Sequence, residues 1–141
     1  MDKKLDSKLV KDFPLLYADR HKNMQETCMC WGFPNDGWEP LIRDLSEKLE
    51  PMIQKWIDEN LDDRENHPRA SQVKEKFGTL RFYMTKQTEE MSIAIREAEA
   101  QSEITCERCV GEGTRRGGGW IRTLCQKCED AYQKEKYNRV P

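Results

Sequence analysis

The chain has 141 residues, of which 35% are charged and 36% hydrophobic, and its formal net charge is −2. This length allows one domain, or one domain with a small attached module, and the polar composition predicts a thin core that needs an additional staple. A slightly acidic chain argues against non-specific nucleic-acid binding by the whole molecule. Residues 103–141, however, hold 8 Lys and Arg against 6 Asp and Glu, so a contact with a polyanion is expected only there.

The sequence carries no pattern of secretion or of membrane insertion. Met1-Asp2-Lys3-Lys4 leads into a charged segment without the apolar stretch of a signal peptide, and no apolar run approaches membrane-spanning length. Six cysteines in such a chain are expected to be reduced thiols and metal ligands. We therefore expect a cytoplasmic protein without membrane attachment.

The first predicted element is a helix over residues 3–12, because Leu5, Leu9 and Val10 fall on one stripe of a helical pattern. The second clear helix covers residues 40–61, where apolar residues recur every three or four positions. Pro51 lies inside this pattern and is expected to kink or divide the helix, since proline removes a backbone donor. The apolar positions are Leu41, Ile42, Leu45, Leu49, Met52, Ile53, Trp56, Ile57 and Leu61.

Between these helices, residues 24–40 form an irregular stretch that is rich in aromatic residues and cysteines. Trp31, Phe33 and Trp38 lie within eight positions of one another, so the stretch either folds into the core or forms an aromatic surface for a partner. Cys28 and Cys30 are expected to be buried thiols without a metal. The alternative is a second metal site that includes His21 or His67, although His67 precedes a proline in a polar loop and is expected to be solvated.

Residues 72–84 change to the two-residue period of a strand, with Leu80, Phe82 and Met84 alternating with polar positions. We predict a hairpin from Gln72 to Lys76 and from Thr79 to Met84, with its turn near Phe77-Gly78. A helix over residues 88–102 follows. Thr88 is its expected cap, and Met91, Ile95, Ala98 and Ser102 form its inner face.

Four cysteines near the C-terminus have the spacing of a zinc site. Cys106-x-x-Cys109 and Cys125-x-x-Cys128 are separated by fifteen residues, and each pair can direct two sulfurs to one tetrahedral ion. Four thiolates leave no open position for water, so one structural Zn²⁺ per chain is predicted. Two disulfides or a redox pair are the other uses of such cysteines.

The fifteen residues between the two pairs include five glycines, three arginines and one tryptophan. We expect Arg115 and Arg116 to project as a basic tip, which meets either a partner or solvent. Trp120, Ile121 and Leu124 are expected to pack beneath the metal. A short terminal helix is predicted from Glu129 to Tyr137.

No catalytic constellation is found in the sequence. It holds no phosphate-binding glycine loop and no serine nucleophile motif, and its two histidines lie in polar surroundings. Its carboxylates are scattered over helix faces. We therefore expect a protein that is not an enzyme and has no catalytic residues.

The sequence contains three distinctive stretches, which are Thr27 to Phe33 with Asp36 to Trp38, Val73 to Tyr83, and Gly118 to Cys125. They resemble a family of small phage- and prophage-encoded proteins with a C-terminal zinc ribbon. The resemblance covers nearly the whole chain and implies an accessory protein that binds and modulates or inhibits a host macromolecule, such as a defence or transcription component. A second resemblance, to the zinc finger of the TraR/DksA group that modulates RNA polymerase, covers residues 103–135.

Together these patterns predict a helix-dominated α+β protein with one antiparallel hairpin and a C-terminal zinc ribbon. Residues 1–102 would form the helical domain, and residues 103–141 the ribbon and terminal helix. A host protein is the expected partner. A nucleic acid bound by the ribbon, or a nucleotide signal held by the aromatic stretch, is the alternative. The expected partner surfaces are Arg115, Arg116 and Trp120 in the ribbon and Trp31, Phe33 and Trp38 in the aromatic stretch.

Overall fold

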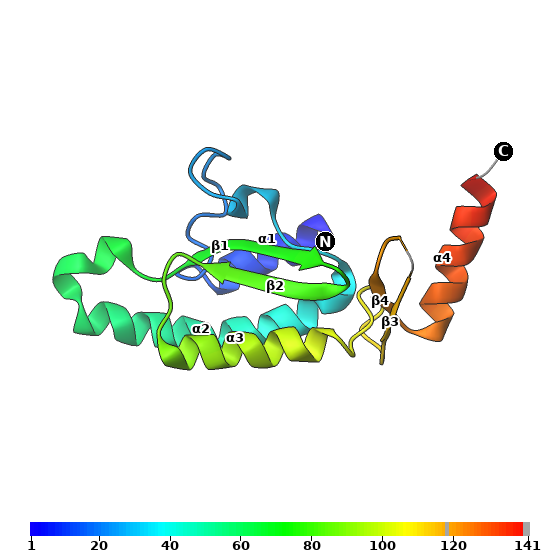
Figure 1. Ribbon diagram of the computed structural model, residues 1–141. Coiled ribbons are helices and arrows are strands. Elements are labelled where there is room, and N and C mark those ends of the chain that lie inside the picture. The colour runs from blue at the N-terminus through cyan, green and yellow to red at the C-terminus, as the bar shows by residue number, and fades with distance from the viewer. Residues whose placement is uncertain (118, 140–141) are drawn as a thin grey trace.

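The computed structural model describes residues 1–117 and 119–139 (Figure 1). The chain is helix-rich and contains two small two-stranded antiparallel sheets, which confirms the α+β class and adds a second hairpin to the predicted one. Among the described helices, none combines the length and apolar character needed to cross a membrane. The elements are α1 (Lys3–Asp12), α2 (Glu39–Glu59), β1 (Ala70–Lys76), β2 (Thr79–Met84), α3 (Glu89–Ser102), β3 (Thr114–Arg116), β4 (Arg122–Leu124) and α4 (Gln126–Arg139).

The long helix α2 supplies the centre of the core through a stripe of buried residues that includes Ile42, Leu45 and Leu49. Pro51 lies inside the helix but does not divide it. Proline has no backbone N–H, so the carbonyl of Glu47, four residues earlier, loses its usual donor. Pro51 and Glu47 are both exposed. Water can therefore satisfy that carbonyl, which explains why the predicted division does not occur.

The segment after α1 is held against α2 by polar groups inside the core. Leu9, Leu16 and Tyr17 are buried, and the Tyr17 hydroxyl lies 2.6 Å from Ser46 Oγ. The Ser46 hydroxyl itself donates to the Ile42 carbonyl at 2.7 Å, so Tyr17 must be the donor in the first bond.

His67 also belongs to this packed region. Its Nε2 lies 2.9 Å from the Leu15 carbonyl oxygen, and the side chain is half-buried. The prediction that His67 is solvated is therefore wrong. A contact across 52 positions of sequence could not be inferred from the polar loop around the histidine.

The hairpin β1–β2 forms with the predicted turn, in which Phe77 and Gly78 have φ values of 55° and 80°. Two positive values in a two-residue loop are typical of the turns that match strand twist. Helix α3 covers the outer edge of β2: Ser102 Oγ accepts from the Leu80 amide at 2.9 Å, and Glu99 Oε2 accepts from the Phe82 amide at 3.0 Å.

Helix α3 itself confirms its predicted beginning and inner face. The Thr88 hydroxyl oxygen accepts from the Met91 amide at 3.3 Å, which caps the helix. Met91, Ile95, Ala98 and Ser102 are all buried.

The aromatic stretch divides between the core and the surface. Trp38 is 0% exposed and Phe33 is 7% exposed, with the Phe33 ring packed edge-on against Tyr17 at 4.8 Å between centroids. Trp31 is 70% exposed. Phe33 and Trp38 are therefore core residues rather than an open partner surface, which corrects that part of the prediction, because their rings complete the core beside Tyr17 and α2.

The second sheet, β3–β4, lies at one end of the molecule, and α4 projects beyond it (Figure 1). Helix α4 begins at Gln126, three residues earlier than predicted, and so includes Cys128. The Arg122 guanidinium lies 3.4 Å from the centre of the Tyr132 ring, and Arg108 forms a bidentate ion pair with Glu135. These two contacts hold α4 against β4 and the first cysteine pair.

Candidate metal centre and the adjoining aromatic cleft

The four predicted ligands converge on one point. The sulfur atoms of Cys106, Cys109, Cys125 and Cys128 all lie within 4.8 Å of one another, and those of Cys109 and Cys125 are 3.5 Å apart. A tetrahedral ion with metal–sulfur bonds of about 2.3 Å requires sulfur–sulfur separations of about 3.8 Å. The cluster therefore fits a single metal ion, and its donor set leaves no protein ligand missing.

Two tight turns position the sulfurs. The Cys106 amide donates to the Gly111 carbonyl at 2.7 Å, and Val110 closes this turn with a φ of 75°. On the other side, Cys125 directly follows β4, and Cys128 lies in the first turn of α4, where its amide donates to Cys125 Sγ at 3.4 Å. Hydrogen bonds from backbone amides favour thiolates, which are the form that binds metal.

The thiols differ in acidity. The backbone amide of Cys128 and the neighbouring thiols lower the pKa of Cys125 to about 7. Burial and the neighbouring sulfurs raise the pKa of Cys128 above its ordinary value. Four thiolates this close repel one another, so full ionisation of the cluster requires a bound cation.

The remaining two cysteines lie apart from the metal cluster. Cys28 is exposed, which contradicts the expectation that it is buried. Cys30 is half-buried, and its thiol donates to the Thr27 carbonyl at 3.3 Å. Within the described residues, neither cysteine joins His21 or His67 in a group with metal-binding separations.

The first cysteine turn is docked on the core by the Asp36–Trp38 turn. The Gly37 amide donates to the Glu107 carbonyl, and Trp38 Nε1 donates to the Thr105 carbonyl, each at 2.9 Å. A Cβ atom at Gly37 would collide with the backbone of Cys106 and Glu107. Glycine at this position therefore permits the close approach of the turn to the ribbon.

The hairpin turn forms the second docking contact. The Thr123 hydroxyl donates to the Gly78 carbonyl at 2.6 Å, and Arg115 donates to the Phe77 carbonyl at 3.0 Å. Arg116 donates to the Leu124 carbonyl at 3.0 Å and is half-buried. Although Arg115 is exposed, both arginines donate to backbone carbonyls rather than projecting as the free basic tip that we expected. Arg115 is held by the adjoining hairpin turn, and Arg116 by β4 of the ribbon itself.

Trp120 lies in a different place from the one predicted. Its side chain is 68% exposed, whereas Leu124 is fully buried and Ile121 is half-buried. The expectation that Trp120 packs beneath the metal is therefore wrong. Leu124 on β4 is the buried apolar residue of this set, and Trp120 instead lines two surface hollows.

The fold brings Trp120 to the same cleft as Trp31, although 89 positions separate them in the sequence. The cleft has a volume of about 410 Å³ and runs between the loop after Trp31 and strand β1. Phe33 contributes to its wall, so three of the six predicted partner residues line one site. A second hollow of about 330 Å³, lined by Phe77, Trp120 and Ile121, adjoins the first one at Trp120.

Glu107 is the residue of this cleft that the sequence did not indicate. It lines the cleft, is 4% exposed, and its Oε2 has no hydrogen-bond partner among the described residues. Burial, and to a smaller degree the charge of Glu75, raise the pKa of Glu107 to about 6. Its position between two metal ligands gave no signal that the cysteine turn would direct it towards a cleft.

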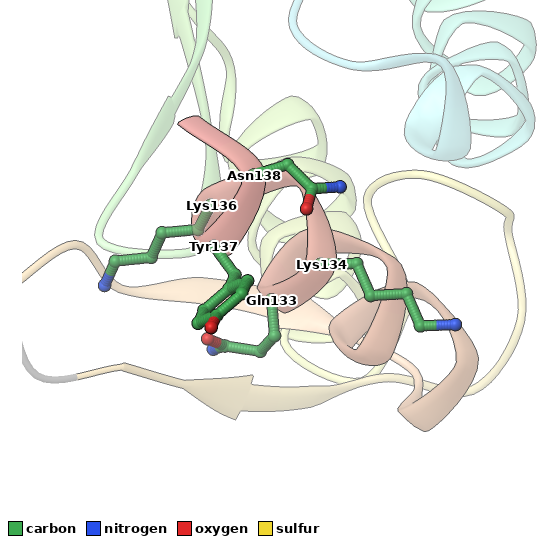
Figure 2. Close-up of a pocket in the computed structure, with 5 residues that line it drawn as sticks. All are labelled: Gln133, Lys134, Lys136, Tyr137 and Asn138. Carbon is green, nitrogen blue, oxygen red and sulfur yellow. The ribbon is translucent and has the colours of Figure 1, made fainter. Parts of the chain in front are cut away.

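A further hollow lies beside α4 and is lined by residues of that helix alone (Figure 2). Gln133 and Tyr137 point the same way, while Lys134 and Lys136 point to either side. Among residues 1–117 and 119–139, no second element contributes to this surface, so the described lining lacks the convergent groups of a binding site.

Comparisons with known proteins found no match among family models, curated proteins or solved structures. The candidate site therefore has to be interpreted from its own geometry.

Proposed function

We propose that this chain is a non-catalytic binding protein in which a zinc ribbon holds an aromatic cleft in shape for a partner protein. The observation that carries the proposal is the convergence of Trp31 and Trp120, which are 70% and 68% exposed, on one cleft beside a buried carboxylate. Exposed tryptophans are costly in water and are enriched where proteins bind one another. The two rings come from segments that meet only because the ribbon is docked on the core.

Zinc is the ion that best suits the site. Four thiolates in a near-tetrahedral group are typical of structural zinc, whereas carboxylate and carbonyl oxygens favour magnesium or calcium. Closed coordination by four sulfurs supports a structural role. In this proposal the metal keeps Glu107 and Trp120 in position and takes no part in a reaction.

The partner is proposed to be a host protein met in the cytoplasm. The resemblance to phage-encoded accessory proteins supports this choice, and inhibition or redirection of that host protein would be the consequence of binding. The test is capture of host proteins by the purified chain, by a Trp31→Ala/Trp120→Ala variant and by a Tyr137→Ala control. Tyr137 is 81% exposed on α4 and lines neither of the two hollows that contain Trp120.

A partner captured by the parent and the Tyr137→Ala control, but lost from the double tryptophan variant, would support the proposal. Equal capture by all three proteins would contradict it. The two alternative partners would give different results. A nucleic acid would be released by moderate salt, and a nucleotide would raise the melting temperature of the purified protein. The engagement of Arg115 and Arg116 with backbone carbonyls disfavours the nucleic acid.

A further inference from the structure

The outer face of the β1–β2 hairpin, which points away from the core, carries two opposed cations. Leu80 and Phe82 are buried in the core, so alternation along β2 places Arg81 and Tyr83 on the opposite face. Lys74 lies directly across the ladder from Arg81, and directly opposed side chains share a face. Like charges in this arrangement destabilise a sheet. An anion bound beside them would offset that cost.

Arg81 is half-buried, yet within the described residues its guanidinium has no ion pair and no hydrogen-bond acceptor. Its Nε is fully shielded from solvent. The other half-buried arginines of the described chain each have a carboxylate, carbonyl or aromatic partner, and they are Arg20, Arg43, Arg69, Arg116 and Arg122. A desolvated donor without an acceptor is costly, so the exception at Arg81 points to an acceptor that a ligand supplies.

Two hollows meet at Tyr83 on this face of the hairpin. One has a volume of about 560 Å³ and is lined by Arg81 and by Arg96 from α3. The other has a volume of about 600 Å³ and is lined by Lys74. Neither Lys74 nor Arg96 forms an ion pair with a described residue. Tyr83 lines both hollows and is 43% exposed, so an accessible aromatic ring lies where the cationic hollows join.

Carboxylates offset only part of this positive charge. Glu99 lines the hollow of the two arginines, but its Oε2 accepts from the Phe82 amide at 3.0 Å. Glu26 lines the hollow of Lys74 and is exposed. The described linings therefore hold three cations against two carboxylates. This surface is locally positive although the chain has a formal net charge of −2, and local charge decides which ligands it attracts.

An accessible aromatic ring beside unpaired cations matches the chemistry of single-stranded nucleic acid. Unpaired bases stack on such rings, while Lys and Arg contact the phosphates of the same strand. In a duplex the bases are paired and stacked on one another, and an acidic peptide has no base to place on the ring. The free arginines of the hairpin differ in this respect from the ribbon arginines, which donate to backbone carbonyls.

We propose that the outer face of the β1–β2 hairpin binds single-stranded nucleic acid, with one base on Tyr83 and phosphates beside Lys74, Arg81 and Arg96. This activity goes beyond the proposed function and does not depend on it. Neither Arg81 nor Arg96 lines the aromatic cleft. Lys74 borders both surfaces, so the test relies on the other three residues.

The test measures binding of a fluorescent oligothymidine of about 12 nucleotides by anisotropy, from about 50 to about 200 mM salt. The proteins are the parent, Arg81→Gln, Arg96→Gln and Tyr83→Ala. Arg64→Gln is the matched control, because Arg64 is exposed and lines neither hollow. Melting temperature and metal content confirm that each variant is folded. Unlabelled competitors are the same strand, an abasic strand of equal length, the matching duplex and polyglutamate.

The parent should bind the strand with a log–log salt slope of about −2, since each phosphate contact on a single strand contributes about −0.7. Arg81→Gln and Arg96→Gln should each weaken binding about fivefold at the lowest salt and reduce the slope by about 0.7. Tyr83→Ala should weaken binding about tenfold and leave the slope unchanged, because it removes stacking and no charge. Arg64→Gln should bind like the parent, and only the intact single strand should compete efficiently.

Two kinds of result would overturn the inference. The first is an absence of binding at about 50 mM salt, or binding by the two hairpin arginine variants and Tyr83→Ala that is as tight as binding by Arg64→Gln. The second is equal competition by the abasic strand, the duplex or polyglutamate. The face would then attract anions in general and would not recognise an unpaired base.

Discussion

Trp38 Nε1 donates to the Thr105 carbonyl at 2.9 Å, and this bond joins the centre of the core to the first cysteine turn. Trp38 is fully buried, so the pair is shielded from water. Gly37, the preceding residue, adds a second bond to the Glu107 carbonyl. The metal centre is therefore an extension of the core, and damage to either is expected to affect the other.

Replacing Trp38 with Phe should weaken this connection. The ring volume is largely kept, but the Thr105 carbonyl loses its donor inside the protein. A buried polar group without a partner costs about 1–3 kcal/mol, and the smaller ring adds to this loss. Urea unfolding should show the decrease in the free energy of unfolding.

Trp31→Phe is the matched control, because that ring is 70% exposed. It should change stability by no more than about 0.5 kcal/mol. Similar losses for the two variants would mean that the bond between Trp38 and Thr105 does not hold the ribbon.

Removing the metal should destabilise the core as well as the ribbon. Metal binding to a folded site contributes to the folding free energy, and the bonds at Gly37 and Trp38 transmit its loss. Chelation should lower the melting temperature of the whole chain in one transition. Metal analysis should find one ion per chain in the parent and in Cys28→Ser, and none in Cys106→Ser. Chelation that leaves the melting temperature unchanged would refute a structural role for the metal.

Local sequence patterns correctly predicted the hairpin, helix α3 and the cysteine cluster. The strand alternation and Gly78 located the hairpin and its turn, and the Thr88 cap with Met91, Ile95 and Ala98 located α3 and its buried face. Cysteine spacing predicted the metal cluster because the two turns are local and rigid. The strand alternation, the helix cap and each Cys-x-x-Cys turn involve residues that are close together in the sequence.

The remaining features depend on contacts between distant segments. Trp31, Phe33 and Trp38 have the same character in the sequence, and only the docking of the stretch on Tyr17 and α2 buries two of them and leaves the third exposed. The burial of Glu107 depends in the same way on the approach of the cysteine turn to the core. No pattern within either segment contains this information.

The Tyr17 hydroxyl should make stability depend on alkaline pH. Complete burial raises the pKa of Tyr17 well above its ordinary value of about 10. The folded state then keeps the proton more tightly than the unfolded state. The contribution of Tyr17 to the free energy of unfolding is therefore constant below about pH 9 and falls as pH rises past about 10. The difference in unfolding free energy between the parent and Tyr17→Phe isolates this contribution from other titrating groups.

Below pH 9 the parent should be more stable than Tyr17→Phe by about 1 kcal/mol, because Ser46 loses the hydrogen bond from the hydroxyl. Above pH 10 this advantage should shrink and then reverse. A difference that stays the same from pH 7 to pH 11 would show that folding does not change the pKa of Tyr17, which would contradict the prediction.

Gly37→Ala should separate the docking of the ribbon from the chemistry of the metal. The added methyl group would meet the backbone of Cys106 and Glu107, neither of which can rotate away as a side chain would. Forcing an extra methyl group into a packed site typically costs about 1–3 kcal/mol. The four cysteines are unchanged, so the metal should still bind, but it should be lost to a chelator faster than from the parent.

Gly119→Ala provides the comparison within the same ribbon, since a methyl group there would meet nothing within 4 Å. It should leave stability and the rate of metal loss unchanged or slightly improved, because alanine has less backbone freedom to lose on folding. Stopped-flow transfer of the metal to a coloured chelator measures both variants. If Gly37→Ala releases the metal no faster than Gly119→Ala, the ribbon keeps its ion without support from the core, and the close approach at Gly37 serves only to pack the two parts together.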